Sequence, residues 1–201
     1  MTNEVSGFGD NAIVTMQTNA KMPEPMGIEG WYHVVCRDKD GNLKWEEEFP
    51  NLVVAVGKQL MLDTLLRTSG TYTTVGPFLG LLNASITPAA TDIMSTIVPS
   101  KEFIAYTVGG SAVRGTAVFS ASSSTGATPS NVTSSTATAV TYTITGSGGT
   151  VYGCFLVTGT GAVNTQSNTS GTLYSEGNFS TAKTTTAGDT VSVTYSTTAT
   201  S

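Results

Sequence analysis

Residues 146–161, GSGGTVYGCFLVTGTG, place a short apolar run between two glycine-rich ends. The glycines do not match a phosphate-binding loop, because Val151 stands where GxGxxG requires its last glycine and no Gly-Lys-Ser/Thr follows. Gly-Ser-Gly-Gly is typical of a hairpin connection instead. We therefore predict a turn, a strand and a second turn. The strand should be central, with both faces covered: Cys154 and Leu156 on one face, Phe155 and Val157 on the other.

Similar short runs, separated by Gly, Pro, Ser and Asn, follow one another through the rest of the chain beyond Thr71. They are PFLGLLN, EFIAYTV, RGTAVFSA, ATAVTYTIT, TVYGCFLVTG, GTLYSEGNF and TVSVTYSTT. In the fourth run Val140, Tyr142 and Ile144 alternate with small or polar residues, as in a strand with one buried face. Only TPAATDIMST interrupts the series, as a short helical turn. Such spacing favours a β-sandwich or jelly roll.

Two elements are expected before these strands. Residues 31–49, WYHVVCRDKDGNLKWEEEF, predict a hairpin whose turn is Asp-Lys-Asp-Gly-Asn. Residues 51–70 change to a spacing of three to four and predict a helix from about 54 to 66, with Gly70 as a stop. Because Leu62 and Leu66 broaden its apolar stripe, we expect a packed helix rather than a surface helix.

Residues 1–29 show no sustained period, and Pro23, Pro25, Gly27 and Gly30 break both helix and sheet. We predict an extended N-terminal arm. Its many apolar residues favour contact with something, either another molecule or the arm's own domain. The predicted organisation is an arm over 1–29 and a jelly-roll-like β domain over 30–201. The fold class is mainly β: an antiparallel β-sandwich or jelly roll with one packed α-helix and this arm.

The composition excludes several classes of partner. Only 11% of the 201 residues are charged and the net charge is −5. Without a Lys/Arg cluster, such a chain has no attraction to a phosphate backbone, so nucleic acid is not expected. No apolar run approaches the length of a membrane span of about 18 residues. The N-terminus lacks the basic start and apolar run of a secretory signal, so we expect synthesis and folding in a cytoplasm.

No catalytic, cofactor-binding or metal-binding set is predicted. The chain has a single histidine, His33, and in an ideal strand it faces away from Cys36. Cys36 and Cys154 are expected as buried free thiols, with a disulfide between them as the alternative. Asp38, Asp40 and Asn42 mimic the start of a calcium loop, but Gly41 is at the fourth position rather than the sixth, so a plain turn is favoured. We expect no enzyme and no cofactor.

Three segments resemble a family of tailed-bacteriophage virion proteins: FPNLVVAVGKQLMLDTLL, IVPSKEFIAYTVGGSAVRGTAVF, and TVYGCFLVTGTG with GTLYSEGNFSTAKTTTAGDTVSVTYSTT. They lie within residues 43–198. In that family an Asn-Leu-Val and glycine-containing helix leads into a jelly-roll-like domain ending in Gly-Asp and a Val-x-Tyr strand. The members that this chain resembles most are capsid cement (decoration) proteins.

The resemblance implies a protein on the outer capsid surface of the virion, made in the host bacterial cytoplasm. Its partner would be the major capsid protein of an HK97-type shell, whose neighbouring capsomers it clamps, and it would self-associate as a dimer in preference to a trimer. Alternatives are a phage tail, collar or fibre-associated structural protein, and a carbohydrate-binding jelly roll at a host-facing tip. From the apolar residues in a breaker-rich segment, we expect these residues to form the clasp: Met22, Pro23, Pro25, Met26 and Trp31.

Overall fold

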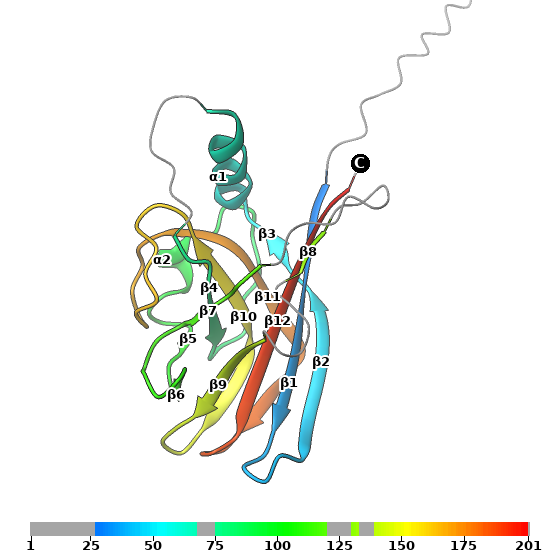
Figure 1. Ribbon diagram of the computed structural model, residues 1–201, viewed down its shortest axis with the longest axis vertical. Helices are drawn as coiled ribbons and strands as arrows, with labels where there is room; N and C mark the ends of the chain where they lie inside the picture. The colour runs from blue at the N-terminus through cyan, green and yellow to red at the C-terminus, as the bar shows by residue number, and fades with distance from the viewer. Residues whose placement is uncertain (1–26, 68–74, 120–129, 133–138, 201) are drawn as a thin grey trace, which may run out of the picture.

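Two antiparallel β-sheets pack face to face, and one helix stands at the end of the resulting sandwich (Figure 1). This architecture comes from a computed structural model, which describes residues 27–67, 75–119, 130–132 and 139–200. The predicted antiparallel β-sandwich with one main helix is confirmed. A second, short helix, α2 (Met94–Ile97), lies in the segment where a helical turn was expected.

The first sheet has the order β2-β1-β12-β9-β6, and β8 also pairs with β12. Its strands are β1 (Gly27–Arg37), β2 (Leu43–Pro50), β6 (Tyr106–Thr107), β8 (Ser130–Val132), β9 (Val140–Ile144) and β12 (Thr190–Thr200). The second sheet has the order β3-β11-β10-β4-β5, and β7 also pairs with β4. Its strands are β3 (Leu52–Val53), β4 (Phe78–Leu82), β5 (Glu102–Phe103), β7 (Gly115–Thr116), β10 (Gly149–Thr158) and β11 (Thr172–Thr185).

Hairpins in this sandwich stay within one sheet. β1 pairs with β2, and β10 pairs with β11. The chain changes sheets elsewhere, for example between β5 and β6, which divide the EFIAYTV run between the two sheets. Because hairpin partners do not alternate between sheets as jelly-roll strands do, we describe the fold as a β-sandwich.

The main core lies between the two sheets. From the first sheet, Tyr32, Val34 and Cys36 of β1 are fully buried, and so are Val191, Val193 and Tyr195 of β12. The period of two that was read from β9 holds, since Val140, Tyr142 and Ile144 point into this core. The buried tyrosines find polar partners: Tyr142 Oη donates to the Leu79 carbonyl at 2.9 Å, and Tyr32 Oη shares a hydrogen bond of 2.8 Å with Ser175 Oγ.

A second apolar cluster lies on the other side of the second sheet. Residues 83–101, which we call the cover segment, lie over this outer face and contribute Ile86, Met94 and Ile97. Against them pack Phe155 and Val157 of β10, whereas Cys154 and Leu156 belong to the main core. Strand β10 is therefore central and covered on both faces, as predicted from residues 146–161.

The glycines beside β10 shape the turns. Gly146 and Gly148 have φ values of 62° and 76°, and Gly159 has a φ of 84°. These left-handed conformations favour glycine over any other residue. A Cβ on Gly148 would also collide with the backbone carbonyl of Thr185. The predicted turn, strand and turn are confirmed.

Three residues that the sequence assigned to the arm lie in a strand. Strand β1 begins at Gly27, which lies opposite Thr200, so residues 27–29 belong to the first sheet. Gly30 does not break the strand either. A Cβ at this position would lie 2.5 Å from Tyr195 Oη and 2.6 Å from Asn51 Oδ1, so the glycine permits a close approach. Residues 1–26 lie outside the described residues.

Candidate functional site

The single histidine is not placed beside a nucleophile. His33 lies on the outer face of the first sheet, with Nε2 2.7 Å from Glu46 Oε1, while Cys36 points into the core, as predicted. Cys36 and Cys154 are free and buried. Burial, followed by the charge of Asp189, raises the pKa of Cys36 to about 11, and burial raises the pKa of Cys154 further. Within the described ranges, no three His, Cys, Asp or Glu side chains gather where they could hold a metal ion.

We expect both thiols to resist labelling in the native protein. A thiolate is the reactive form, and burial suppresses both its formation and its contact with a reagent. Treatment with an aromatic disulfide reagent should give slow labelling in buffer and rapid labelling of two thiols after unfolding in urea. Rapid labelling of Cys154 in the native protein would contradict its central position in β10.

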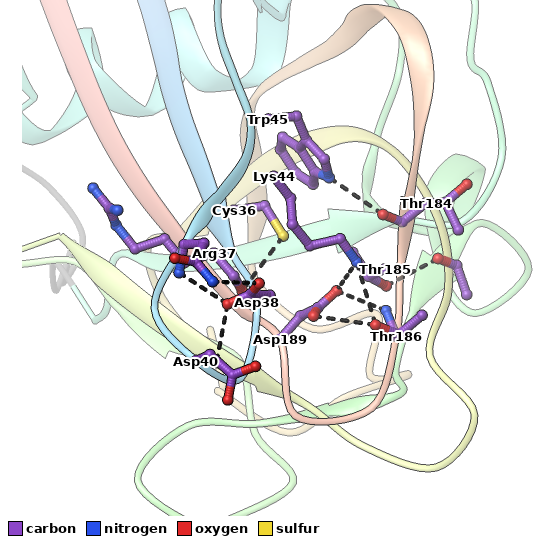
Figure 2. A network of polar contacts seen from close by, with 12 residues as sticks. Cys36, Arg37, Asp38, Asp40, Lys44, Trp45, Thr184, Thr185, Thr186 and Asp189 are labelled. Carbon is purple, nitrogen blue, oxygen red and sulfur yellow. Dashed lines mark hydrogen bonds and ion pairs between the residues drawn. The ribbon is translucent and has the colours of Figure 1, made fainter.

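In the turn that resembles a calcium loop, the carboxylate oxygens of Asp38 accept hydrogen bonds from the turn itself. Asp38 Oδ1 accepts from the backbone N–H groups of Asp40 at 2.9 Å and Asn42 at 2.8 Å, and Oδ2 accepts from Asn42 Nδ2 at 3.0 Å. These hydrogen bonds, led by those of Asn42, lower the pKa of Asp38. Gly41 has a φ of 87°. The segment forms the hairpin turn that the sequence predicts (Figure 2).

Asp189, in the Gly-Asp pair of the resemblance, closes the turn between β11 and β12 (Figure 2). Its Oδ2 lies 2.6 Å from Lys44 Nζ and accepts from the Thr186 N–H at 2.8 Å. Burial opposes ionisation of this carboxyl, but the hydrogen bonds from Lys44 and Thr186 outweigh it, so the pKa of Asp189 is lowered. Nearby, Trp45 Nε1 donates to the Thr184 carbonyl. The network ties edge strand β2 to the β11–β12 turn.

A fully buried ion pair, unpredicted from the sequence, holds the loop after β10. Arg114 Nε lies 2.7 Å from Glu102 Oε1, and Arg114 Nη2 lies 2.9 Å from Glu102 Oε2. Arg114 Nη2 also donates to the Asn168 carbonyl at 2.8 Å, while Glu102 Oε2 accepts from the Ser167 N–H at 2.7 Å. Both charged groups are therefore paired and hydrogen-bonded, which is the arrangement that a buried ion pair requires. The geometry is that of a structural clamp.

Helix α1 (Ala55–Leu66) carries the largest exposed apolar feature that we find in the described residues. Its sequence, AVGKQLMLDTLL, mixes apolar side chains with four polar or charged ones, so no single face of the helix is apolar. Gly57 is its only buried residue, and Leu62, Leu65 and Leu66 are 44%, 77% and 70% exposed. We call Leu60, Met61, Leu62, Leu65 and Leu66 the α1 apolar surface.

The expectation of a packed helix is therefore wrong for most of α1, because its leucines remain exposed. The helix contacts the sandwich through its first turns: Val56 packs against the second apolar cluster, and a Cβ on Gly57 would lie 2.6 Å from the Tyr174 carbonyl oxygen. Beside this contact is an open groove of about 380 Å³ with a mostly apolar lining. Its lining residues are Gly57, Leu60, Met61, Thr64, Leu65, Thr158 and Tyr174.

The structure places one of the five residues expected in the clasp. Trp31 lies on β1, on the outer face of the first sheet, and is 42% exposed. Met22, Pro23, Pro25 and Met26 lie outside the described residues. The start of β1 is close to the start of α1, because the Asn51 N–H donates to the Gly30 carbonyl at 2.9 Å just before β3 and α1. Figure 1 shows α1 at the end of the sandwich where β1 begins.

Neither helix of the described chain is long and apolar enough to cross a membrane. In comparisons with known proteins, no family model, no curated protein and no solved structure matches the chain.

Proposed function

We propose that this protein is a non-enzymatic capsid cement (decoration) protein, which binds the outside of a phage major capsid protein shell and clamps neighbouring capsomers. The phage assignment rests on the resemblance of residues 43–198 to tailed-bacteriophage virion proteins. The observation that carries the binding role is the α1 apolar surface. A helix that exposes three leucines has apolar surface that a partner would cover.

Apolar contacts suit a protein that must hold a particle together in varied salt. Burying a leucine side chain contributes about 1.5–3 kcal/mol, and salt does not screen this contribution as it screens exposed charge pairs. With Leu62, Leu65 and Leu66 exposed, the α1 apolar surface offers several such contacts. On a lattice, each weak contact becomes effectively intramolecular once its neighbours have formed, so occupancy gains avidity.

The N-terminal arm is the second part of the proposed clamp. The strand that follows it, β1, begins at Gly27, at the end of the sandwich that carries α1 (Figure 1). The arm's Met22, Pro23, Pro25 and Met26 and the exposed Trp31 would thus extend the contact begun by α1. A chain that starts at Gly27 preserves every β1 pair and is expected to fold but to occupy fewer sites on the shell. Unchanged occupancy would remove the arm from the proposal.

Counting copies per virion tests the location. Quantitative mass spectrometry of purified particles should find on the order of hundreds of copies if the protein decorates the shell, against about three to twelve for a symmetric tail, collar or fibre part. Absence from purified particles would contradict a virion role altogether. Sedimentation velocity of the free protein, with a chain mass of 20.7 kDa, tests the proposed dimer against a trimer.

Carbohydrate binding is the second candidate, and the outer face of the first sheet favours it. Trp31 is exposed opposite Ser196, and the same face carries Thr141 and Ser192, whose hydroxyls lie 3.1 Å apart. A flat hydroxyl surface with an indole ring can stack and hydrogen-bond a sugar. Glycan-array binding that Trp31→Ala abolishes would support this role. Trp45 is unsuitable for the test because its ring packs 5.5 Å from Phe179.

A further inference from the structure

One buried carboxyl group, that of Glu176, lies among apolar residues and forms no ion pair in the described part of the chain. Glu176 on β11 is fully buried, with Leu52 of β3 and Phe155 of β10 as its neighbours across the ladders. Neither of its side-chain oxygens receives a hydrogen bond from a protein donor among the described residues. A buried carboxylate without a donor is costly, so Glu176 requires a proton or a compensating group.

The cover segment supplies the neighbour. Asp92 is close enough to Glu176 to raise the pKa of that carboxyl through a hydrogen bond and through its charge, and Asp92 Oδ2 accepts the Ala89 N–H at 2.8 Å. The Ala89 amide favours the ionised form of Glu176, but burial and Asp92, which favour the protonated form, have the larger effects. Two neighbouring carboxyl groups repel when both are ionised, but one shared proton turns repulsion into a hydrogen bond.

The remaining charges around Glu176 do not neutralise it. Lys101, at the end of the cover segment, exerts a weak favourable field. Arg114 lies over the Phe155 ring, 5.3 Å from its centroid, but its guanidinium is held by Glu102. From β10, Tyr152 packs against the same apolar cluster. Strands β3 and β4 and helix α2 contain no titratable side chain, and the one ionisable group in the first turn of α1, Lys58, is exposed.

The cover segment is attached at two points near the carboxyl pair. Asn178, two residues after Glu176 on β11, accepts the Ile86 N–H at 3.1 Å and donates to the Ile86 carbonyl at 2.6 Å. The Ala55 N–H, at the start of α1, donates to the carbonyl of Ala90, two residues before Asp92, at 2.8 Å. A force that pushes Asp92 away from β11 therefore acts on the backbone that holds the first turn of α1.

We propose that Asp92 and Glu176 share one proton and form a pH-sensitive latch, whose loss of that proton releases the cover segment from the second sheet and frees the N-terminus of α1. Burial, followed by the hydrogen bond and the charge of Asp92, raises the pKa of Glu176 to about 8. In the open form this carboxyl returns to an ordinary value of about 4.3. The latch is thus strongest below a pH of about 4.3, weakens as pH rises, and reaches its weakest state above the closed-form value.

Hydrogen exchange of the isolated protein tests the latch without any partner, so its outcome is independent of the capsid proposal. After correction for the intrinsic rate, the opening constant reported by the Ile86 and Ala55 amides should rise about tenfold per pH unit between about pH 5 and 8. Glu176→Gln, which keeps a hydrogen-bond donor toward Asp92 and cannot ionise, should abolish this rise. Glu48→Gln, an exposed carboxyl on β2, is the matched control and should behave as the unaltered protein.

A carbon-13 titration of the Glu176 carboxyl in the unaltered protein keeps the proposal testable if the variant does not fold. A midpoint near 8 supports the latch, and a midpoint near 4 to 5 overturns it. Exchange that follows the same pH profile in Glu176→Gln and the unaltered protein would also overturn it. Asp92→Asn, which supplies an amide donor to an ionised Glu176, should flatten the profile as well.

Discussion

Replacing Arg114 with methionine is expected to lower the free energy of unfolding by about 3–5 kcal/mol, because Glu102 would remain as a buried charge without its partner. Arg114 is fully buried and makes both hydrogen bonds of the ion pair, at 2.7 and 2.9 Å. The substitution also removes the donor to the Asn168 carbonyl, so the loop after β10 loses its clamp. Urea unfolding followed by circular dichroism measures the change.

Two further variants separate the charge effect from lost packing. Arg114→Met combined with Glu102→Leu removes both charges and is expected to be more stable than Arg114→Met alone. Lys39→Ala breaks the exposed pair between Lys39 and Asp40 and should change stability by less than about 1 kcal/mol. If Arg114→Met alone behaves like Lys39→Ala, the buried pair is not a clamp.

The second large effect is expected on binding rather than on stability. Changing Leu65 and Leu66 to glutamine removes two exposed leucines from the α1 apolar surface. If each leucine contributes about 1.5–3 kcal/mol when a partner buries it, the double variant should bind the shell at least about a hundredfold more weakly. Glutamine is preferred to glutamate because a negative charge at a helix C-terminus opposes the helix dipole.

A loss of binding is informative only if the double variant remains as stable as the original protein. Exposed positions tolerate polar residues, so the free energy of unfolding of the double variant should stay within about 0.5 kcal/mol of the original for each substitution. Leu43→Gln alters an exposed leucine on β2, in the first sheet, and is the matched control. Loss of binding in both the double variant and Leu43→Gln would point to a nonspecific apolar effect instead of a site on α1.

The strands were predictable because their side chains alternate or are apolar on both faces. The run TVYGCFLVTG predicts a central position for β10, since a strand that is apolar on both sides must be covered on both faces. The break in EFIAYTV was not predictable from the pattern. The run is continuous in sequence, yet the chain leaves one sheet after Phe103 and enters the other at Tyr106, with Ile104 exposed between them.

The sequence located the helix correctly but did not predict how much of it is exposed. The apolar spacing in residues 51–70 correctly located α1, but spacing cannot tell which apolar residues the rest of the chain covers. Here Val56 and Gly57 hold the first turns of the helix against the sandwich, and the described part of the sandwich does not cover Leu65 or Leu66. Sequence reasoning therefore assigned to the core the residues that the structure exposes.

The few charged residues in the C-terminal half indicated where polar interactions would occur, but they did not identify the partners. After Arg114, the only charged residues in the rest of the chain are Glu176, Lys183 and Asp189. The structure pairs Lys183 with Glu47 and Asp189 with Lys44, and it buries Arg114 with Glu102. Glu176 is the exception, since its neighbour is another carboxyl. Partners so far apart in sequence could not be assigned from spacing, because nothing local relates them.

Titration of the purified protein onto phage shells assembled without it tests the central proposal most directly. Shell-bound copies, counted after sedimentation, should rise to a saturating number set by the shell lattice, and Leu65→Gln with Leu66→Gln should prevent this rise while Leu43→Gln does not. Shells that bind no protein over the whole titration would contradict a cement function. Equal saturation by the double variant would show that the α1 apolar surface is not the binding site.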